Sequence, residues 1–249
     1  MSIHMRGLDL PILDRLALFL DLDGTLAPIA ATPDEVFLDA GVLDLLSQLT
    51  QRLDGRLAII SGRRLESLDR ILNGRIIAAA GLHGLERRTS SRVRTAVPAH
   101  PGLSRAREEF QRLANVQPGL LVEDKELGIA LHYRRAPGSG KTARALGHRL
   151  AAGTGLAVQE GEMVIELLTP GQDKGAAVLA FMAEAPFAGA IPVFVGDDLT
   201  DENAFSAASA CGGFGIRVGP ERETKARYRL ADVDAALALL HALIEGPTA

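Results

Sequence analysis

Short uninterrupted runs of apolar residues recur along this chain, and each stops at a polar or turn-forming residue. The runs are LALFL at 16–20, LAII at 57–60, IIAAA at 76–80, VIELL at 164–168 and PVFV at 192–195. Runs of this length are typical of strands covered on both faces, as in a parallel sheet between helices. Because 47% of the 249 residues are apolar, the composition also excludes intrinsic disorder.

Helical spacing lies between several of these runs. Val42, Leu45 and Leu49 fall on one helical face, and a second face of this kind starts at Leu65 and ends near Asn73. Alternating strands and helices predict an α/β fold, with a doubly wound, mostly parallel sheet that is Rossmann-like. In such a sheet a binding site lies beyond the carboxyl ends of the strands.

The middle of the chain has a different pattern. It reads as an amphipathic helix at 104–113, strand character at 120–134, a Pro/Gly loop at 136–140, a helix at 141–152 and strands near 156–168. This order predicts an antiparallel sheet with helices. We therefore expect a split core, 1–100 with 171–249, that carries an inserted α+β cap at 101–170.

Charge and cysteine content exclude several classes of partner. The net charge is −4 and there is no long lysine or arginine block, so we expect neither nucleic acid nor an anionic membrane surface as a partner. Cys211 is the only cysteine, and no apolar stretch approaches the roughly 20 residues that cross a bilayer. We expect a cytoplasmic protein that is a monomer or a weak oligomer and acts on a small molecule.

Two carboxylates directly follow the first apolar run, in the sequence DLDGT at 21–25. Asp21 and Asp23 can approach one point, with Gly24 allowing a sharp turn. Two carboxylates about 4 Å apart repel by about 4 kcal/mol at an effective dielectric constant near 20. We therefore expect either a divalent cation such as Mg²⁺ between them or a proton on one of them.

A second acidic segment, GDDLTD at 196–201, follows the run PVFV. Asp197 and Asp201 are four residues apart and can share one face of a turn or helix start. If both runs are neighbouring strands, at least four carboxylates gather at the same edge of the sheet. The net charge of the chain is close to zero, so a cluster of mutually repelling carboxylates at one place needs an explanation. A bound metal ion is the simplest explanation.

Two further segments suit an anion. Ser61 and Gly62 follow the run at 57–60 and can present a hydroxyl and a backbone N–H at a helix start, where phosphate binds readily. Lys174 lies in a loop that leads into another helix and supplies a positive charge.

The order of these four segments resembles the four motifs of the haloacid dehalogenase-like (HAD) phosphohydrolases, and the insertion is similar to the type C2 caps of that superfamily. The resemblance implies that Asp21 attacks phosphorus, and that Asp23 protonates the leaving oxygen and later deprotonates the hydrolytic water. It also implies that the phosphoryl oxygens are bound by Thr25, Ser61, Gly62 and Lys174. The implied ligands of Mg²⁺ are Asp21, the Asp23 carbonyl and Asp197, and the implied supporting residues are Asp198 and Asp201.

Charged residues interrupt the strands expected in the cap. Glu123 and Lys125 lie two residues apart, and Glu166 stands within VIELL. Buried charges are costly unless they are paired, so these residues are either ion pairs and rim residues or groups that bind sugar hydroxyls.

The wider pattern resembles the trehalose-6-phosphate phosphatase family. The segments that carry this resemblance are GLHG at 81–84, the string from Glu123 to Arg134, the strand with Glu166 and GDDLTDENAF at 196–205. It implies Mg²⁺-dependent hydrolysis of trehalose 6-phosphate, the last step of trehalose biosynthesis, through an aspartyl-phosphate. It further implies that Glu123, Lys125 and Glu166 bind the distal glucose, with Arg63 and His83 near the sugar phosphate. Leu168-Thr169 departs from the family pattern, which has a basic residue before Pro170.

Three other functions fit parts of the sequence. APGSGKT at 136–142 resembles a phosphate-binding P-loop of a kinase or NTPase, but Arg135 stands where that pattern needs glycine. A phospho-accepting signalling module also gathers aspartates at a sheet edge, although it has no use for an acid at Asp23 or for a cap. A third candidate is a HAD phosphatase for another ester, such as sucrose phosphate or a hexose phosphate.

Overall fold

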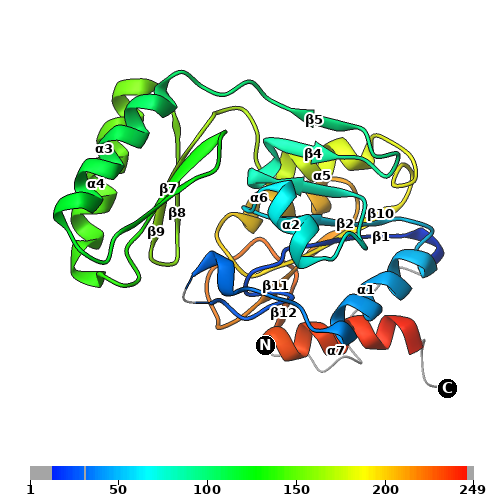
Figure 1. Cartoon of the computed structure of the whole chain (residues 1–249). Coiled ribbons are helices and arrows are strands. Elements are labelled where there is room, and N and C mark those ends of the chain that lie inside the picture. Colours follow the sequence, from blue (N-terminus) through cyan, green and yellow to red (C-terminus); the bar gives the residue numbers. More distant parts are fainter. Residues whose placement is uncertain (1–12, 31, 246–249) are drawn as a thin grey trace. The chain divides into compact units, whose positions relative to one another are not determined.

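The computed structural model describes residues 13–30 and 32–245 and divides into two compact units (Figure 1). The core unit spans 1–95 and 173–249, and the cap unit spans 96–172. The boundaries expected from the sequence, 101 and 170, lie within the cap unit. The sequence predicts that residues 1–12 and 246–249 belong to the core, and these residues lie outside the described ones.

The core unit is built on a mostly parallel sheet with the strand order β12-β11-β10-β1-β2-β3-β4-β5. Its strands are β1 Leu16–Leu20, β2 Leu57–Ile60, β3 Ala79–Gly81, β4 Glu86–Arg88, β5 Arg94–Ala96, β10 Ile191–Gly196, β11 Phe214–Val218 and β12 Tyr228–Leu230. The pairs from β12 to β3 are parallel, and β4 is antiparallel to β3. The expected α/β fold class is therefore confirmed.

Helices cover both faces of this sheet. They are α1 Ala40–Arg52, α2 Leu65–Ile71, α5 Lys174–Met182, α6 Asp201–Ala210 and α7 Val233–Glu245, with short 3₁₀ turns η2 Leu13–Arg15, η3 Pro33–Glu35 and η4 Leu82–Gly84. No helix among the described residues is both long and apolar enough to span a membrane.

Strand β1 shows why its sequence is apolar without alternation. Leu16, Leu18 and Leu20 pack into a cluster with α1 and α7, whereas Ala17 and Phe19 pack into a second cluster with α5 and α6. Both faces of the strand are thus buried, as the uninterrupted run predicts.

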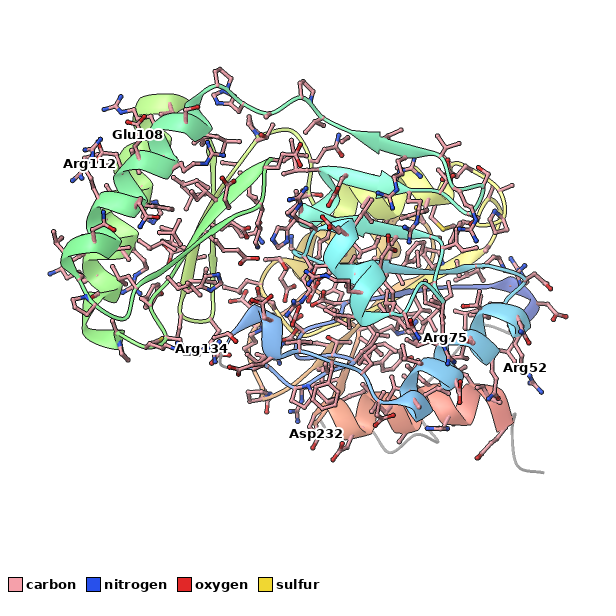
Figure 2. All side chains as sticks on the ribbon, viewed as in Figure 1. Arg52, Arg75, Glu108, Arg112, Arg134 and Asp232 are labelled. Carbon is pink, nitrogen blue, oxygen red and sulfur yellow. The ribbon has the colours of Figure 1, made fainter. Side chains whose placement is uncertain are left out.

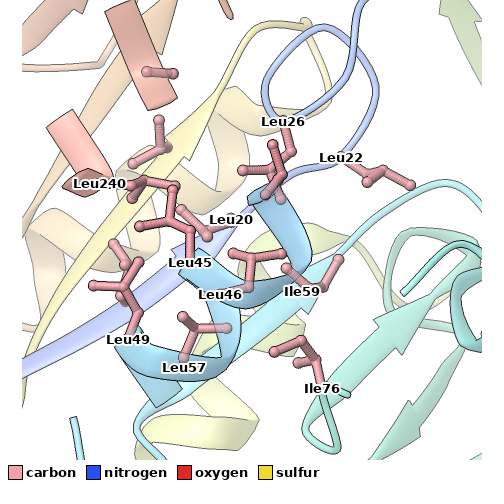
Figure 3. Close-up of a cluster of buried hydrophobic side chains, with 14 of the residues drawn as sticks. Leu20, Leu22, Leu26, Leu45, Leu46, Leu49, Leu57, Ile59, Ile76 and Leu240 are labelled. Carbon is pink, nitrogen blue, oxygen red and sulfur yellow. The ribbon is translucent and has the colours of Figure 1, made fainter. Parts of the chain in front are cut away.

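The first of these clusters is visible in Figure 3. Leu45, Leu46 and Leu49 of α1 lie over Leu20 of β1 and Leu57 of β2. All five side chains are almost completely buried. This layer holds the strands whose carboxyl ends carry the acidic residues.

The cap unit contains a four-stranded antiparallel sheet with the order β6-β7-β9-β8. Its elements are α3 Gly102–Val116, β6 Leu121–Asp124, β7 Gly128–His132, η5 Pro137–Ser139, α4 Gly140–Thr154, β8 Ala157–Gly161 and β9 Val164–Leu168. The run VIELL is therefore β9 and pairs antiparallel, unlike the other four apolar runs, which contribute to the parallel sheet. An apolar run indicates that a strand is buried, but burial alone does not decide whether the strand pairs parallel or antiparallel with its neighbours.

Helices α3 and α4 pack against one face of the cap sheet. Ile129 and Leu131 of β7 and Ile165 and Leu167 of β9 form an apolar cluster with residues such as Phe110 of α3. The outer side of α3 is charged, and Figure 2 shows its Glu108 and Arg112 pointing away from the sheet. The opposite face of the sheet carries the polar residues described below.

Candidate active site

The polar residues of the core unit gather where β1, β2 and β10 end. In the parallel register Leu20 lies beside Val195 on one side and beside Ile59 on the other. The next residue after β1 is Asp21, whose backbone N–H donates to the Val195 carbonyl at 2.9 Å. The residues that follow the three strands therefore meet at one edge of the sheet, as parallel pairing requires.

Three carboxylates meet at this edge. Asp21, Asp197 and Asp201 each offer an oxygen, and these oxygens all lie within 4.8 Å of one another. Burial raises the pKa of Asp21 well above its usual value, and the carboxylates of Asp201 and Asp197 add to the effect while Lys174 opposes it. Burial and Asp201 likewise raise the pKa of Asp197 to about 7. The cluster therefore resists carrying all its charges without a further cation.

Lys174 supplies one positive charge inside this cluster. It is the first residue of α5 and is buried, with Nζ 3.0 Å from Asp21 Oδ1 and 2.7 Å from Asp201 Oδ1. Burial lowers the pKa of Lys174, but Asp201 and Asp21 outweigh that effect, so the net pKa is raised and the amine stays charged. One ammonium against three carboxylates leaves an excess of negative charge.

The donor set of this cluster fits Mg²⁺. Carboxylate oxygens are the ligands that this cation prefers, and a cation would relieve the repulsion that raises the pKa values of Asp21 and Asp197. Asp201 already uses both oxygens, since Oδ1 accepts from Lys174 and Oδ2 accepts from the Asp198 backbone N–H at 2.9 Å. Asp21 and Asp197 are therefore the better direct ligands, and Asp201 holds the surrounding groups in place.

The turn after β1 brings Thr25 and Gly24 against Asp197. The Thr25 hydroxyl is 3.5 Å from Asp197 Oδ1, and Thr25 is fully buried. Gly24 has a φ of +79°, and a Cβ at this position would lie 2.1 Å from Asp197 Oδ2. Only glycine allows the turn and the carboxylate to approach so closely.

Arg63 holds the carboxylate of Asp23. Its Nε donates to Asp23 Oδ2 at 2.7 Å and its Nη2 to Oδ1 at 2.8 Å. This bidentate pair orients the Asp23 carboxyl group, and each of its oxygens keeps a second lone pair for a proton or a further hydrogen bond. The sequence placed both residues near the phosphate but gave no sign that they pair.

Ser61, Gly62 and His83 lie together next to this pair. Ser61 follows β2 and is buried, and its backbone carbonyl accepts from the His83 N–H at 3.0 Å. A Cβ on Gly62 would lie 2.6 Å from the His83 ring. His83 has a φ of +58°, a left-handed conformation that is uncommon for a residue with a side chain and is often found at functional sites.

The three charged cap residues are paired with one another. Lys125 Nζ is 2.6 Å from Glu166 Oε1 and 4.0 Å from Glu123 Oε2. His132 Nε2 is also 2.9 Å from Glu123 Oε2. The charges that interrupt the cap strands are therefore brought together within the cap unit, and His132 joins them.

The loop at 136–142 has a packing role in the cap. Pro137–Ser139 form η5 and Gly140 begins α4. A Cβ on Gly140 would lie 2.9 Å from the Tyr133 ring, which accounts for one of the glycines in the P-loop-like string.

Sequence reasoning missed Arg222 and Glu202. Arg222 Nη2 donates to the backbone carbonyl of Asp197 at 3.1 Å and lies 3.4 Å from Glu202 Oε1. The loop after β11 is thereby tied to the acidic loop after β10. No local pattern around Arg222 indicates this contact, because it depends on the loop between β11 and β12.

Comparison with known proteins identifies the family. The model of the trehalose-phosphatase family matches residues 19–234. The trehalose-6-phosphate phosphatase of Escherichia coli (strain K12) is 39% identical over 219 residues, which are 87% of this chain and 82% of that protein.

Solved structures agree with this result. A trehalose-6-phosphate phosphatase related protein is 30% identical, with a TM-score of 0.77 over 92% of this chain and 97% of that chain. A haloacid dehalogenase-like hydrolase from Bacteroides thetaiotaomicron is 17% identical and has a TM-score of 0.64 over 91% of this chain and 98% of that chain, which shows the shared fold.

Proposed function

Because the chain belongs to the trehalose-phosphatase family and has the HAD fold, we propose that it hydrolyses trehalose 6-phosphate to trehalose and phosphate, with Mg²⁺ as its cofactor. The observation that carries the proposal is the cluster of Asp21, Asp197 and Asp201, in which the buried Lys174 contacts Asp21 and Asp201. The expectations of a cytoplasmic location and of a monomer or weak oligomer remain predictions.

In the first step, an Asp21 carboxylate oxygen attacks phosphorus and the bond from phosphorus to the sugar oxygen breaks. Asp23 gives its proton to that oxygen, so trehalose leaves as a neutral alcohol. Lys174 lies 3.0 Å from Asp21 and opposes the effect of burial on its pKa, which favours the ionised nucleophile.

In the second step, water attacks the aspartyl-phosphate. Asp23 takes a proton from the water, the bond from phosphorus to the Asp21 oxygen breaks, and phosphate leaves. Arg63 donates to both oxygens of Asp23 and so holds this carboxyl group in one orientation for the transfer. The carboxyl group of Asp23 thus acts first as an acid and then as a base.

Asp21, Asp197 and the backbone carbonyl of Asp23 would hold Mg²⁺, with Asp198 and Asp201 supporting them. Bound there, the cation would neutralise charge on the phosphoryl oxygens. The remaining phosphoryl contacts would come from Thr25, Ser61, Gly62 and Lys174, which provide hydroxyl, amide and ammonium donors. Arg63 and His83 would lie near the sugar phosphate.

The cap would select the sugar. Glu123, Lys125 and Glu166 combine carboxylate acceptors with an ammonium donor, and sugar hydroxyls need both kinds of partner. Such a set disfavours ligands that lack the matching hydroxyls, because buried polar groups are then left unpaired.

The test is phosphate release from trehalose 6-phosphate, sucrose 6-phosphate, glucose 6-phosphate and p-nitrophenyl phosphate, with and without EDTA. We expect the highest kcat/KM for trehalose 6-phosphate and a loss of turnover in EDTA that added Mg²⁺ restores. A higher kcat/KM for another ester would contradict trehalose 6-phosphate as the substrate and would favour that ester instead.

The nucleophile is tested by Asp21→Asn. We expect turnover to fall by at least about a thousandfold with the Tm preserved, since the amide keeps the shape but is a poor nucleophile. Retained turnover on trehalose 6-phosphate would contradict the role of Asp21.

A further inference from the structure

A row of residues crosses all four strands of the cap sheet on the face opposite α3 and α4. In the antiparallel register Glu123 of β6 lies beside Ala130 of β7, Ala130 beside Glu166 of β9, and Glu166 beside Gln159 of β8. Directly paired residues share a face, so these four side chains lie on one side of the sheet. The small Ala130 separates the two carboxylates.

His132 lies on the same face as this row. It is two residues beyond Ala130 along β7, and side chains two apart on a strand point to the same side. Its neighbours in sequence on the other face, such as Leu131, pack against the helices instead. His132 is therefore positioned beside Glu123 rather than in the apolar cluster.

The contacts divide the two carboxylates between two donors. Lys125 Nζ lies 2.6 Å from Glu166 but 4.0 Å from Glu123, so it belongs mainly to Glu166. The nearest partner of Glu123 is His132, with Nε2 at 2.9 Å from Oε2. Among the described residues, Oε1 of Glu123 accepts no hydrogen bond, and the side chain is one-third exposed at 34%.

The electrostatics agree with this division. Burial raises the pKa of Glu123, but the hydrogen bond from His132 and the charge of Lys125 outweigh burial, so the net pKa is lowered. Glu123 is thus kept as a carboxylate whose Oε2 is occupied and whose Oε1 can accept from a hydroxyl.

We propose that His132 is a positioning residue for sugar recognition: it holds Glu123 through Oε2 so that Oε1 accepts a hydrogen bond from a hydroxyl of the distal sugar. This inference rests on the proposed function and adds a residue to it. A glutamate on a strand has three rotatable side-chain bonds, and fixing one oxygen removes most of that freedom before the sugar binds.

The test uses two substitutions at this position. His132→Phe keeps a planar ring and removes the donor, whereas His132→Gln places an amide nitrogen near the position of imidazole Nε2. For His132→Phe we expect kcat/KM on trehalose 6-phosphate to fall about tenfold or more relative to kcat/KM on p-nitrophenyl phosphate, mainly through KM. His132→Gln should recover most of this ratio.

The chain offers a matched control in the same unit. His148 Nε2 lies 2.6 Å from Glu160 Oε1, and Glu160 pairs with Ile165 and so lies on the face that packs against the helices. His148→Phe also removes a hydrogen bond between a histidine and a glutamate, but on the other face of the sheet from Glu123 and Glu166. We expect it to leave the ratio of the two kcat/KM values within about twofold of the original, because it does not touch Glu123.

A double-mutant cycle shows whether His132 acts through Glu123. In a Glu123→Ala background, adding His132→Phe should change the ratio by less than about twofold, because the side chain to be positioned is already absent. Additive losses would overturn the inference.

Other outcomes separate this inference from the proposed function. Proportional losses on both substrates, or a normal ratio in His132→Phe, would overturn the role of His132 alone. A wild-type chain that hydrolyses p-nitrophenyl phosphate but not trehalose 6-phosphate would overturn the proposed function, and this inference with it.

Discussion

At the scale of single residues, the candidate site depends on close approach. Gly24 adopts a left-handed conformation and lies against Asp197, and Lys174 reaches two carboxylates at once. Short distances of this kind make the site sensitive to a single added methyl group.

We expect Gly24→Ala to lower kcat/KM on trehalose 6-phosphate by about a hundredfold, because the new Cβ would displace Asp197 and the turn would be strained. The control is Gly138→Ala in the cap, since a Cβ there would meet no atom within 4 Å. Steady-state kinetics on both variants checks this, and equal activities would show that the contact with Asp197 is unimportant.

At the scale of elements, the start of α5 determines where Lys174 lies. Asp173 is the N-cap of that helix, and its side chain accepts from the Ala176 N–H at 2.8 Å and from the Asn203 amide at 3.0 Å. Since Lys174 is the first helical residue, the cap that stabilises the helix also positions the ammonium group.

We expect Asp173→Ala to lower the Tm by about 2–4 °C, since loss of an N-cap costs about 1 kcal/mol, and also to lower kcat/KM several-fold. Asp39 caps α1 in the same way, accepting from the Val42 N–H at 2.9 Å. Asp39→Ala should lower the Tm similarly but leave kcat/KM unchanged. Calorimetry and kinetics on both variants separate the two effects, and an unaltered kcat/KM in Asp173→Ala would contradict the positioning role.

At the scale of the whole molecule, the acidic cluster links the stability of the fold to pH. The pKa of Asp197 is raised from 3.8 to about 7 in the folded chain. Between about pH 4 and pH 7 the folded state therefore holds a proton that the unfolded chain has lost. The free energy of unfolding of the metal-free protein consequently falls as the pH rises through this range.

Mg²⁺ would compete with that proton. We expect Mg²⁺ to raise the Tm more at about pH 8 than at about pH 5.5, because deprotonated carboxylates bind the cation with a lower Kd and a lower Kd gives a larger stabilisation of the folded state. Thermal unfolding with and without Mg²⁺ at both values measures this. In Asp197→Asn, the rise in Tm caused by Mg²⁺ should differ less between the two pH values. A larger rise in Tm at the lower pH in the unmodified chain would contradict the assignment of Asp197 as a Mg²⁺ ligand.

Much of the core could be predicted from local pattern. LALFL and PVFV are buried on both faces, and the residues after them, Asp21 and Asp197, meet because the two strands are parallel neighbours. The run VIELL lies in the segment for which the order of elements predicts an antiparallel sheet, and it pairs antiparallel with β7 and β8. Its Glu166 interrupts the run and is paired with Lys125.

The α/β fold, the strand ends that bear acidic residues and the charged cap strands could all be predicted from the sequence, because they depend on periodicity and on the order of residues along the chain. Three contacts follow from the folded chain alone: Arg63 pairs with Asp23, Arg222 donates to the Asp197 carbonyl, and His132 hydrogen-bonds Glu123. These contacts join residues through the register of strands and the course of loops. Contacts of this kind are set by packing across the whole domain, which no local segment encodes.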